Sequence, residues 1–152
     1  MKSKNIKIAT ILPYKENYTH SKASAASLWV SEFLKKSKFK KNNYIFGSTL
    51  NKDYLSKNYI NIELKSIKSK FKSTTSEYVG KLIKKISNKK FDIIEVHNRP
   101  LILDYLLKNI NSKFIFYFHN DPLSMNGSKS EKQRLGILKN VEKIVFVSNW
   151  VQ

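Results

Sequence analysis

The fold is indicated most directly by residues 91–118, which read FDIIEVHNRPLILDYLLKNINSKFIFYF. The apolar run over 91–97 predicts a buried strand, and Pro100 suits the first turn of a helix over 101–108. A second strand is expected over 114–118, where five apolar residues follow one another without alternation, as in strands buried on both faces. Strand, helix and strand in this order predict a βαβ unit with parallel strands.

The alternation of strands and helices extends over the rest of the chain. Further strands are expected over residues 6–12, 44–47, 59–64 and 144–147, and further helices over 23–36, 78–86 and 131–140. The chain has 152 residues, and no stretch rich in Pro, Gly and Ser is long enough to separate two domains. We therefore expect one α/β domain over residues 1–152, a Rossmann-like, doubly wound and mainly parallel sheet of six or seven strands flanked by helices.

The composition excludes several kinds of site. The chain has no cysteine, which rules out disulfides, cysteine-ligated zinc and thiol nucleophiles. Its four glycines cannot form a G-x-G-x-x-G or a Walker loop, which disfavours a nicotinamide dehydrogenase or a P-loop phosphotransferase. No cofactor and no bound metal are expected, since no two of the three histidines share a metal-ligand spacing.

The net charge of +18 has two interpretations. Of the 29 basic residues 27 are lysine, and Lys, Asn and Ile all have AT-rich codons, so compositional drift accounts for much of this surface without a selected partner. The charge is concentrated in residues 1–90, where 21 lysines face 5 acidic residues, so a functional basic face for an anionic membrane or acceptor stays open. Nucleic acid is disfavoured as the partner because its readers favour arginine. A basic Rossmann-like module that binds nucleic acid or the surface of a membrane remains an alternative function for the chain.

The location and the boundaries of the chain follow from its apolar runs. The run after Met1 stops at Pro13 without a cleavage site, and no stretch approaches the roughly 18 apolar residues of a spanning helix. We expect a cytoplasmic protein, with the basic and apolar segment 65–72 either a solvated loop or a contact with an anionic membrane. Because a helix N-cap at Ser148 comes just before Gln152, we also expect the chain to be cut from a longer protein.

Unusual polar residues follow the predicted strands, where open α/β sheets bind their ligands. They are Tyr14 and Ser21–Ser24 after the first strand, His97, Asn98 and Arg99 after the fourth, His119, Asn120 and Asp121 after the fifth, and Ser148, Asn149 and Trp150 after the sixth. All three histidines lie at or beyond a strand end. This edge of the sheet is the candidate active site.

Each of these residues also has a purely structural interpretation. His97 closes a buried strand, where a histidine is often a hydrogen-bonded core residue. Arg99 suits a phosphate or carboxylate ligand, or else an ion pair with an acidic residue of the chain: Asp92, Glu95 or Asp121. Asp121 is expected to start a turn or helix. His119 is expected to face a ligand, as a group that orients a hydroxyl or as a general acid or base.

The small residues Ala23–Ala26 begin the first helix. Free N–H groups at a helix start favour an anion such as a diphosphate, and close packing of helix on sheet explains the same residues equally well.

Three motifs together resemble the bacterial family 4 glycosyltransferases of GT-B fold. They are the stretch 91–100 (FDIIEVHNRP), Phe118-His119-Asn120-Asp121-Pro122 with Met125 close behind, and Val147-Ser148-Asn149-Trp150-Val151. Residues 23–30 are similar to the first helix of that family. The motifs occur in the order and spacing of the family, and the resemblance covers nearly the whole chain.

The resemblance implies the N-terminal, acceptor-side half of a retaining transferase that moves a sugar from a nucleotide-sugar to a cell-surface glycan or lipid-linked acceptor. It implies that His119 lies near the reacting sugar, that Tyr14, His97, Asn98, Arg99 and Asn120 line the acceptor side, and that Ser21, Lys22, Ala23 and Ser24 approach the donor diphosphate. The family has a glycine-rich turn at this last position, and residues 21–24 contain no glycine. The half that holds the nucleotide-sugar and its paired glutamates is absent from these 152 residues, so the fragment alone is expected to be inactive.

Overall fold

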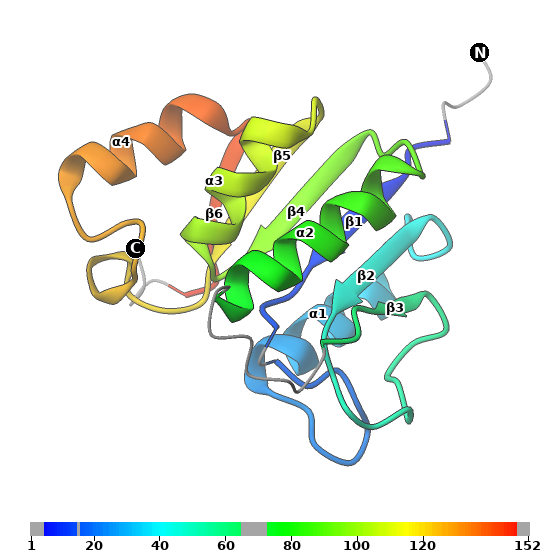
Figure 1. Cartoon of the computed structure of the whole chain (residues 1–152). Coiled ribbons are helices and arrows are strands. Elements are labelled where there is room, and N and C mark those ends of the chain that lie inside the picture. The colour runs from blue at the N-terminus through cyan, green and yellow to red at the C-terminus, as the bar shows by residue number, and fades with distance from the viewer. Residues whose placement is uncertain (1–4, 15, 65–72, 149–152) are drawn as a thin grey trace.

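The computed structural model of the chain describes residues 5–14, 16–64 and 73–148, in which six parallel strands form one sheet (Figure 1). The strands are β1 (Ile8–Ile11), β2 (Asn43–Gly47), β3 (Tyr59–Asn61), β4 (Ile93–His97), β5 (Lys113–Phe118) and β6 (Lys143–Phe146). Their order across the sheet is β3-β2-β1-β4-β5-β6. This is the strand order of a doubly wound Rossmann-like sheet, which confirms the expected fold class.

Four α-helices connect the strands. They are α1 (Ala25–Lys36), α2 (Thr74–Ser87), α3 (Pro100–Asn109) and α4 (Glu131–Asn140), and a short 3-10 helix, Pro122–Ser124, follows β5. In Figure 1, α2 and α3 lie in front of the sheet and α1 lies behind it. This division follows from the strand order, because right-handed crossovers that run in opposite directions place their helices on opposite faces.

The two faces of the sheet bury different kinds of core. Residues from α2, α3 and α4 pack with Ala9, Ile11, Phe46, Val96 and Phe116 in a wholly apolar cluster. On the opposite face, Val30 and Leu34 of α1 pack on Leu12 and Ile45. The strand residues that share this second face include polar side chains, and they form the base of the candidate site.

The expected elements are all present, with shifted ends. The first strand begins at Ile8 instead of residue 6, and the third ends at Asn61 instead of residue 64. The first helix begins at Ala25 because the hydroxyl of Ser24 caps it, accepting from the backbone N–H of Ser27 at 3.2 Å. No helix within the described ranges is both long and apolar enough to cross a bilayer.

Candidate active site at the carboxyl edge of the sheet

The candidate site lies where the strand order changes direction, between β1 and β4. Chain connections leave this point toward opposite faces, and open α/β sheets bind their ligands at such a point, beyond the carboxyl ends of the strands. The loops after β1, β4 and β5 lie at this edge, and they carry the residues that the sequence singled out. The register pairs His97 of β4 with Tyr117 of β5, so the polar ends of the two strands lie level with each other.

His97 and His119 form a hydrogen-bonded pair at this edge. Nδ1 of His97 lies 2.8 Å from Nε2 of His119, and the ring centroids are 5.1 Å apart. His97 is buried and His119 is half-buried. The sequence left open whether His97 is a core residue or a ligand-binding one, and the structure shows a buried side chain that holds the more accessible His119.

Both imidazoles favour their neutral forms. Burial, and to a smaller extent the neighbouring His119, hold the pKa of His97 well below its usual range. Burial lowers the pKa of His119 to about 4. A pair of neutral imidazoles joined by one hydrogen bond leaves His119 with one further nitrogen that can donate or accept.

Trp29 of α1 covers the histidine pair. Its ring lies edge-on to His119 at 5.4 Å between centroids and tilted against His97 at 6.0 Å. His97 also stacks on Tyr117, with centroids 4.4 Å apart and the planes within 7°, and the ring of Trp29 contacts Tyr117 at 5.7 Å. These aromatic contacts fix the orientation of the His97 ring.

A buried polar network continues from this pair toward the middle of the sheet. Glu95, two residues before His97 on the same strand face, accepts from the hydroxyl of Tyr117 at 3.3 Å and lies 2.6 Å from the hydroxyl of Thr10. The Thr10 hydroxyl is also 2.9 Å from Oδ1 of Asn43. Burial raises the pKa of Glu95, and the hydrogen bonds with Thr10, Tyr117 and Asn43 partly offset this rise.

Asn98 adopts a strained backbone conformation to connect β4 to the candidate site. Its φ is 55°, in the left-handed region that few residues other than glycine adopt. Its backbone N–H donates to the carbonyl of Tyr117 at 2.8 Å, and its side-chain oxygen accepts from the backbone N–H of His119 at 3.3 Å. Asn98 therefore ties the loop after β4 to the loop after β5 and holds His119 in place.

Arg99 is exposed and makes no ion pair with any residue of the described ranges. Its guanidinium lies over the ring of Tyr14 at 6.0 Å, and Tyr14 in turn packs against Tyr78. By contrast, the guanidinium of Arg134 donates to the carbonyls of Ser128 and Lys129. Of the two roles considered for Arg99, the ion pair with Asp92, Glu95 or Asp121 is not found among the described residues.

The predicted donor-phosphate residues are largely engaged within the protein. The backbone N–H of Ser21 donates to the carboxylate of Asp53 at 2.7 Å, and the hydroxyl of Ser21 accepts from Asn51. The backbone N–H of Lys22 donates to Thr19, and Ser24 caps α1, while Ala23 is half-buried before the helix. Lys22 alone has a side chain that is exposed and cationic.

The remaining predicted residues fall into three groups. Asn120 is exposed beside His119, and Asp121 has the expected structural role, since its carboxylate accepts from the backbone N–H of Leu123 at 2.8 Å. His20 is exposed in the loop after β1, and within the described part of the chain no three His, Asp or Glu side chains are grouped to hold a metal ion. The basic segment 65–72 and the residues Asn149 and Trp150 lie outside the described residues.

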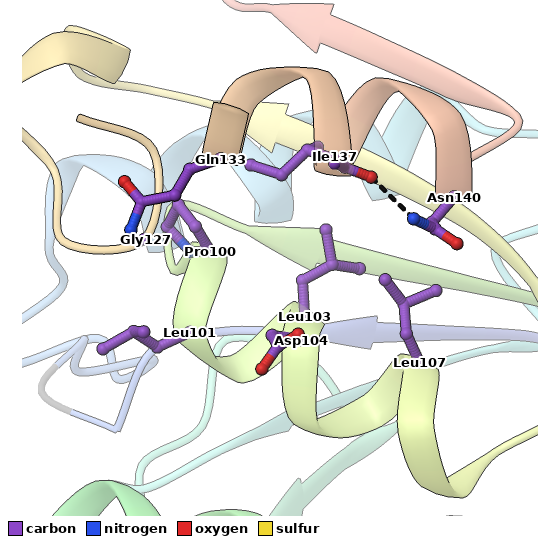
Figure 2. Close-up of a pocket in the computed structure, with 10 residues that line it drawn as sticks. Pro100, Leu101, Leu103, Asp104, Leu107, Gly127, Gln133, Ile137 and Asn140 are labelled. Carbon is purple, nitrogen blue, oxygen red and sulfur yellow. Dashed lines mark hydrogen bonds between the residues drawn. The ribbon is translucent and has the colours of Figure 1, made fainter. Parts of the chain in front are cut away.

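A separate groove lies between α3 and α4, away from the histidine pair (Figure 2). Its volume is about 310 Å³, and its walls include Leu101, Leu103 and Leu107 of α3 and Ile137 of α4. Gly127 closes one end with a φ of 94°, and a β-carbon there would lie only 3.0 Å from Pro100. The lining of this groove is mainly apolar, with Asp104, Gln133 and Asn140 as its polar side chains, and it includes no histidine.

Four residues of the candidate site are not among those predicted from the sequence: Thr10, Trp29, Glu95 and Tyr117. A signal for Glu95 was present, because Glu95 and His97 are two residues apart in a predicted strand and so share one face. Trp29 had no such signal, since its position over His97 depends on how α1 packs on the sheet.

No protein-family model matches the chain, and a search of curated proteins gives no significant match. The candidate function therefore rests on the residues described above and on the resemblance of the three motifs.

Proposed function

We propose that the chain is the acceptor-side half of a retaining glycosyltransferase of GT-B architecture. The whole enzyme would transfer a sugar from a nucleotide-sugar to a cell-surface glycan or a lipid-linked acceptor in a bacterium. The second half would bind the nucleotide and supply most of the stabilisation of charge at the anomeric carbon and the leaving phosphate. No cofactor and no metal ion take part in this proposal.

The observation that carries the proposal is the placement of His119. It is held at the carboxyl edge of a Rossmann-like sheet by a hydrogen bond to His97 and by the side chain of Asn98 at its backbone. A neutral imidazole held in one orientation suits a hydrogen bond to a hydroxyl group of the sugar or of the acceptor. The residue that the motifs match to the cleft histidine is thus held at this edge by two hydrogen bonds.

Arg99, Tyr14 and Asn120 would form the acceptor side. The exposed guanidinium over Tyr14 provides a cation without an ion-pair partner among the described residues, next to an aromatic ring that can pack on a sugar. An acceptor with a phosphate or carboxylate group fits these two side chains.

The donor-phosphate role of residues 21–24 has weaker support. The carboxylate of Asp53 accepts from the backbone N–H of Ser21, a donor that a diphosphate would otherwise use, and it repels an anion. Lys22 remains as a cation that can approach the diphosphate. In this proposal Lys22 is the contact that this chain makes with the donor diphosphate, and the second half of the enzyme makes the other contacts with the nucleotide-sugar.

The proposed location is the cytoplasm, with contact to the inner face of the membrane. A lipid-linked acceptor is presented at that surface, and an excess of lysine attracts anionic lipid. Flotation with vesicles tests this part, because binding to vesicles with anionic lipid and none to neutral vesicles is the expected result.

The proposal is tested by reading the coding sequence beyond Gln152 and assaying its product. A second βα array with paired glutamates is expected, and the product should transfer sugar from one member of a nucleotide-sugar panel to a glycan or lipid-linked acceptor. The fragment 1–152 alone should transfer none. Transfer by the fragment, or a continuation without a second βα array, would contradict the proposal.

A further inference from the structure

One buried nitrogen of the candidate site lacks a hydrogen-bond partner. His97 is 1% exposed, and its Nε2, the ring nitrogen that does not face His119, has no partner among the described residues. Buried ring nitrogens are nearly always paired, either with protein or with an ordered water. The partner of Nε2 is therefore to be sought in the space beside it.

A small cavity adjoins His97 under α1. It offers about 10 Å³ to the centre of a water-sized sphere, which is about the room that one water molecule needs. The residues that line it are Thr10, Trp29, Val30, Phe33, Leu34, Asn43, Glu95 and His97. A water there has four polar residues around it, Thr10, Asn43, Glu95 and His97, and the other side chains of the lining are aromatic or aliphatic.

The hydrogen atoms of the neighbouring network can be placed from the distances. The hydroxyl of Thr10 lies within hydrogen-bond distance of Oδ1 of Asn43 and of Oε2 of Glu95, and it has one hydrogen to donate. If Thr10 donates to Asn43, the short contact with Glu95 requires that Glu95 carries a proton and donates it to Thr10. If Thr10 donates to Glu95 instead, the carboxyl group can be ionised; burial raises its pKa, and its hydrogen bonds with Thr10, Tyr117 and Asn43 lower it. Its Oε1 then accepts from Tyr117 and has a lone pair left.

We propose that one internal water fills this cavity and donates to both Oε1 of Glu95 and Nε2 of His97. His97 then carries its proton on Nδ1 and donates it to Nε2 of His119, whose own proton must lie on Nδ1. Glu95 is thus a positioning residue that selects, through the water and His97, the tautomer of His119. In this arrangement Nε2 of His97, which otherwise lacks a partner, accepts from the water, and both histidine rings are neutral.

The tautomers and the water do not depend on glycosyl transfer, whereas their effect on transfer rests on the proposed function. In the transferase, His119 would offer Nδ1–H as a donor to a sugar or acceptor oxygen. If the tautomers are as assigned and no transfer is found, the proposed function fails and the assignment stands. If transfer is found and the tautomers differ from those assigned, the assignment fails and the proposed function stands.

Nuclear magnetic resonance of the chain labelled with ¹⁵N-histidine tests the assignment. Long-range ¹H–¹⁵N correlations at neutral pH are expected to show a protonated Nδ1 and an unprotonated Nε2 in both His97 and His119. A cross-peak between the ring of His97 and a water is also expected. A protonated Nε2 in either ring, or averaging between two tautomers at His119, would overturn the proposal.

Two pairs of variants separate positioning from mere packing. Glu95→Gln keeps a donor toward Thr10 and an acceptor toward the water, so both tautomers should persist, whereas Glu95→Leu removes these contacts and should give mixed tautomers at His119. Val30→Ile adds a methyl group to the cavity and should abolish the water cross-peak; the matched control Val79→Ile, in the core on the opposite face, should not. Unchanged tautomers in folded Glu95→Leu would contradict the positioning role.

Discussion

Nδ1 of His97 lies 2.8 Å from Nε2 of His119, and this one contact joins the buried end of β4 to the accessible loop after β5. One ring must donate and the other accept, so protonation of both rings would break the bond and place two positive charges side by side. Acid should therefore destabilise the folded chain by protonating this pair.

The stability of the protein should fall as the pH drops from about 6.5 to about 4. The pKa of His119 is about 4 in the folded chain against 6.5 in the unfolded one, so the unfolded chain binds more protons in this window. His97, with its pKa also lowered, acts in the same direction. Glu95 acts in the opposite direction. Burial raises its pKa, so its contribution to the stability of the folded chain is present at low pH and is lost as the pH rises through its folded pKa.

Urea unfolding at a series of pH values measures this effect. His119→Gln should flatten the dependence of the unfolding free energy on pH between about 6.5 and 4. His20→Gln, which removes the exposed histidine, is the matched control and should keep the wild-type dependence. An equally steep profile in His119→Gln would show that the pair does not govern the acid response.

Trp29→Ala should destabilise the protein by about 2–3 kcal/mol, somewhat less than the truncation of a fully buried tryptophan. The indole packs on His97, Tyr117 and His119 and is half-buried. Leu28→Ala is the matched control on the same helix, since Leu28 is 48% exposed, and it should cost roughly 1 kcal/mol or less. Thermal or urea unfolding of the two variants compares them; equal losses would mean that Trp29 does not cover the pair as described.

Asn98→Gly and Asn98→Ala should differ in stability. At a φ of 55° glycine is unstrained, whereas alanine loses the same side-chain hydrogen bond to His119 and keeps the steric cost of about 1–2 kcal/mol. The alanine variant is therefore expected to unfold at lower urea than the glycine variant. The reverse order would indicate that Asn98 is not held in the left-handed region.

The two arginines of the chain should respond differently to replacement by glutamine. Arg99→Gln removes an exposed cation over Tyr14 and should change the unfolding free energy by roughly 0.5 kcal/mol or less. Arg134→Gln removes the donor to two backbone carbonyls and should cost about 1–2 kcal/mol. If Arg99 proved the more important for stability, its availability for an acceptor would be in doubt.

The sequence predicted the layers of the fold well because parallel strands and amphipathic helices leave strong local patterns. Pro100 at the start of α3 and the Ser130 cap of α4 are signals of this kind, and α4 has the predicted bounds, Glu131–Asn140. The ends of β1 and β3 were predicted too long, because pairing with neighbouring strands, and not apolar character alone, decides where a strand ends.

Several residues of the candidate site were predicted from the sequence, but the contacts between their side chains were not. Strand ends placed His97, Asn98 and His119 at one edge, as the structure has them. The hydrogen bond between the two histidines, the cover by Trp29 and the engagement of Ser21 by Asp53 all join segments far apart in the sequence. Such contacts depend on side-chain packing, for which a single sequence provides no periodic signal.

The most direct test of the proposed function is the kcat of sugar transfer by the full-length product of the coding sequence and by its His119→Ala variant. Loss of a positioned hydrogen bond at the reacting sugar should lower kcat by about 100-fold or more, with His20→Ala close to the wild type. A kcat in His119→Ala equal to that of the wild type, or no transfer from any nucleotide-sugar by the folded full-length protein, would contradict the account.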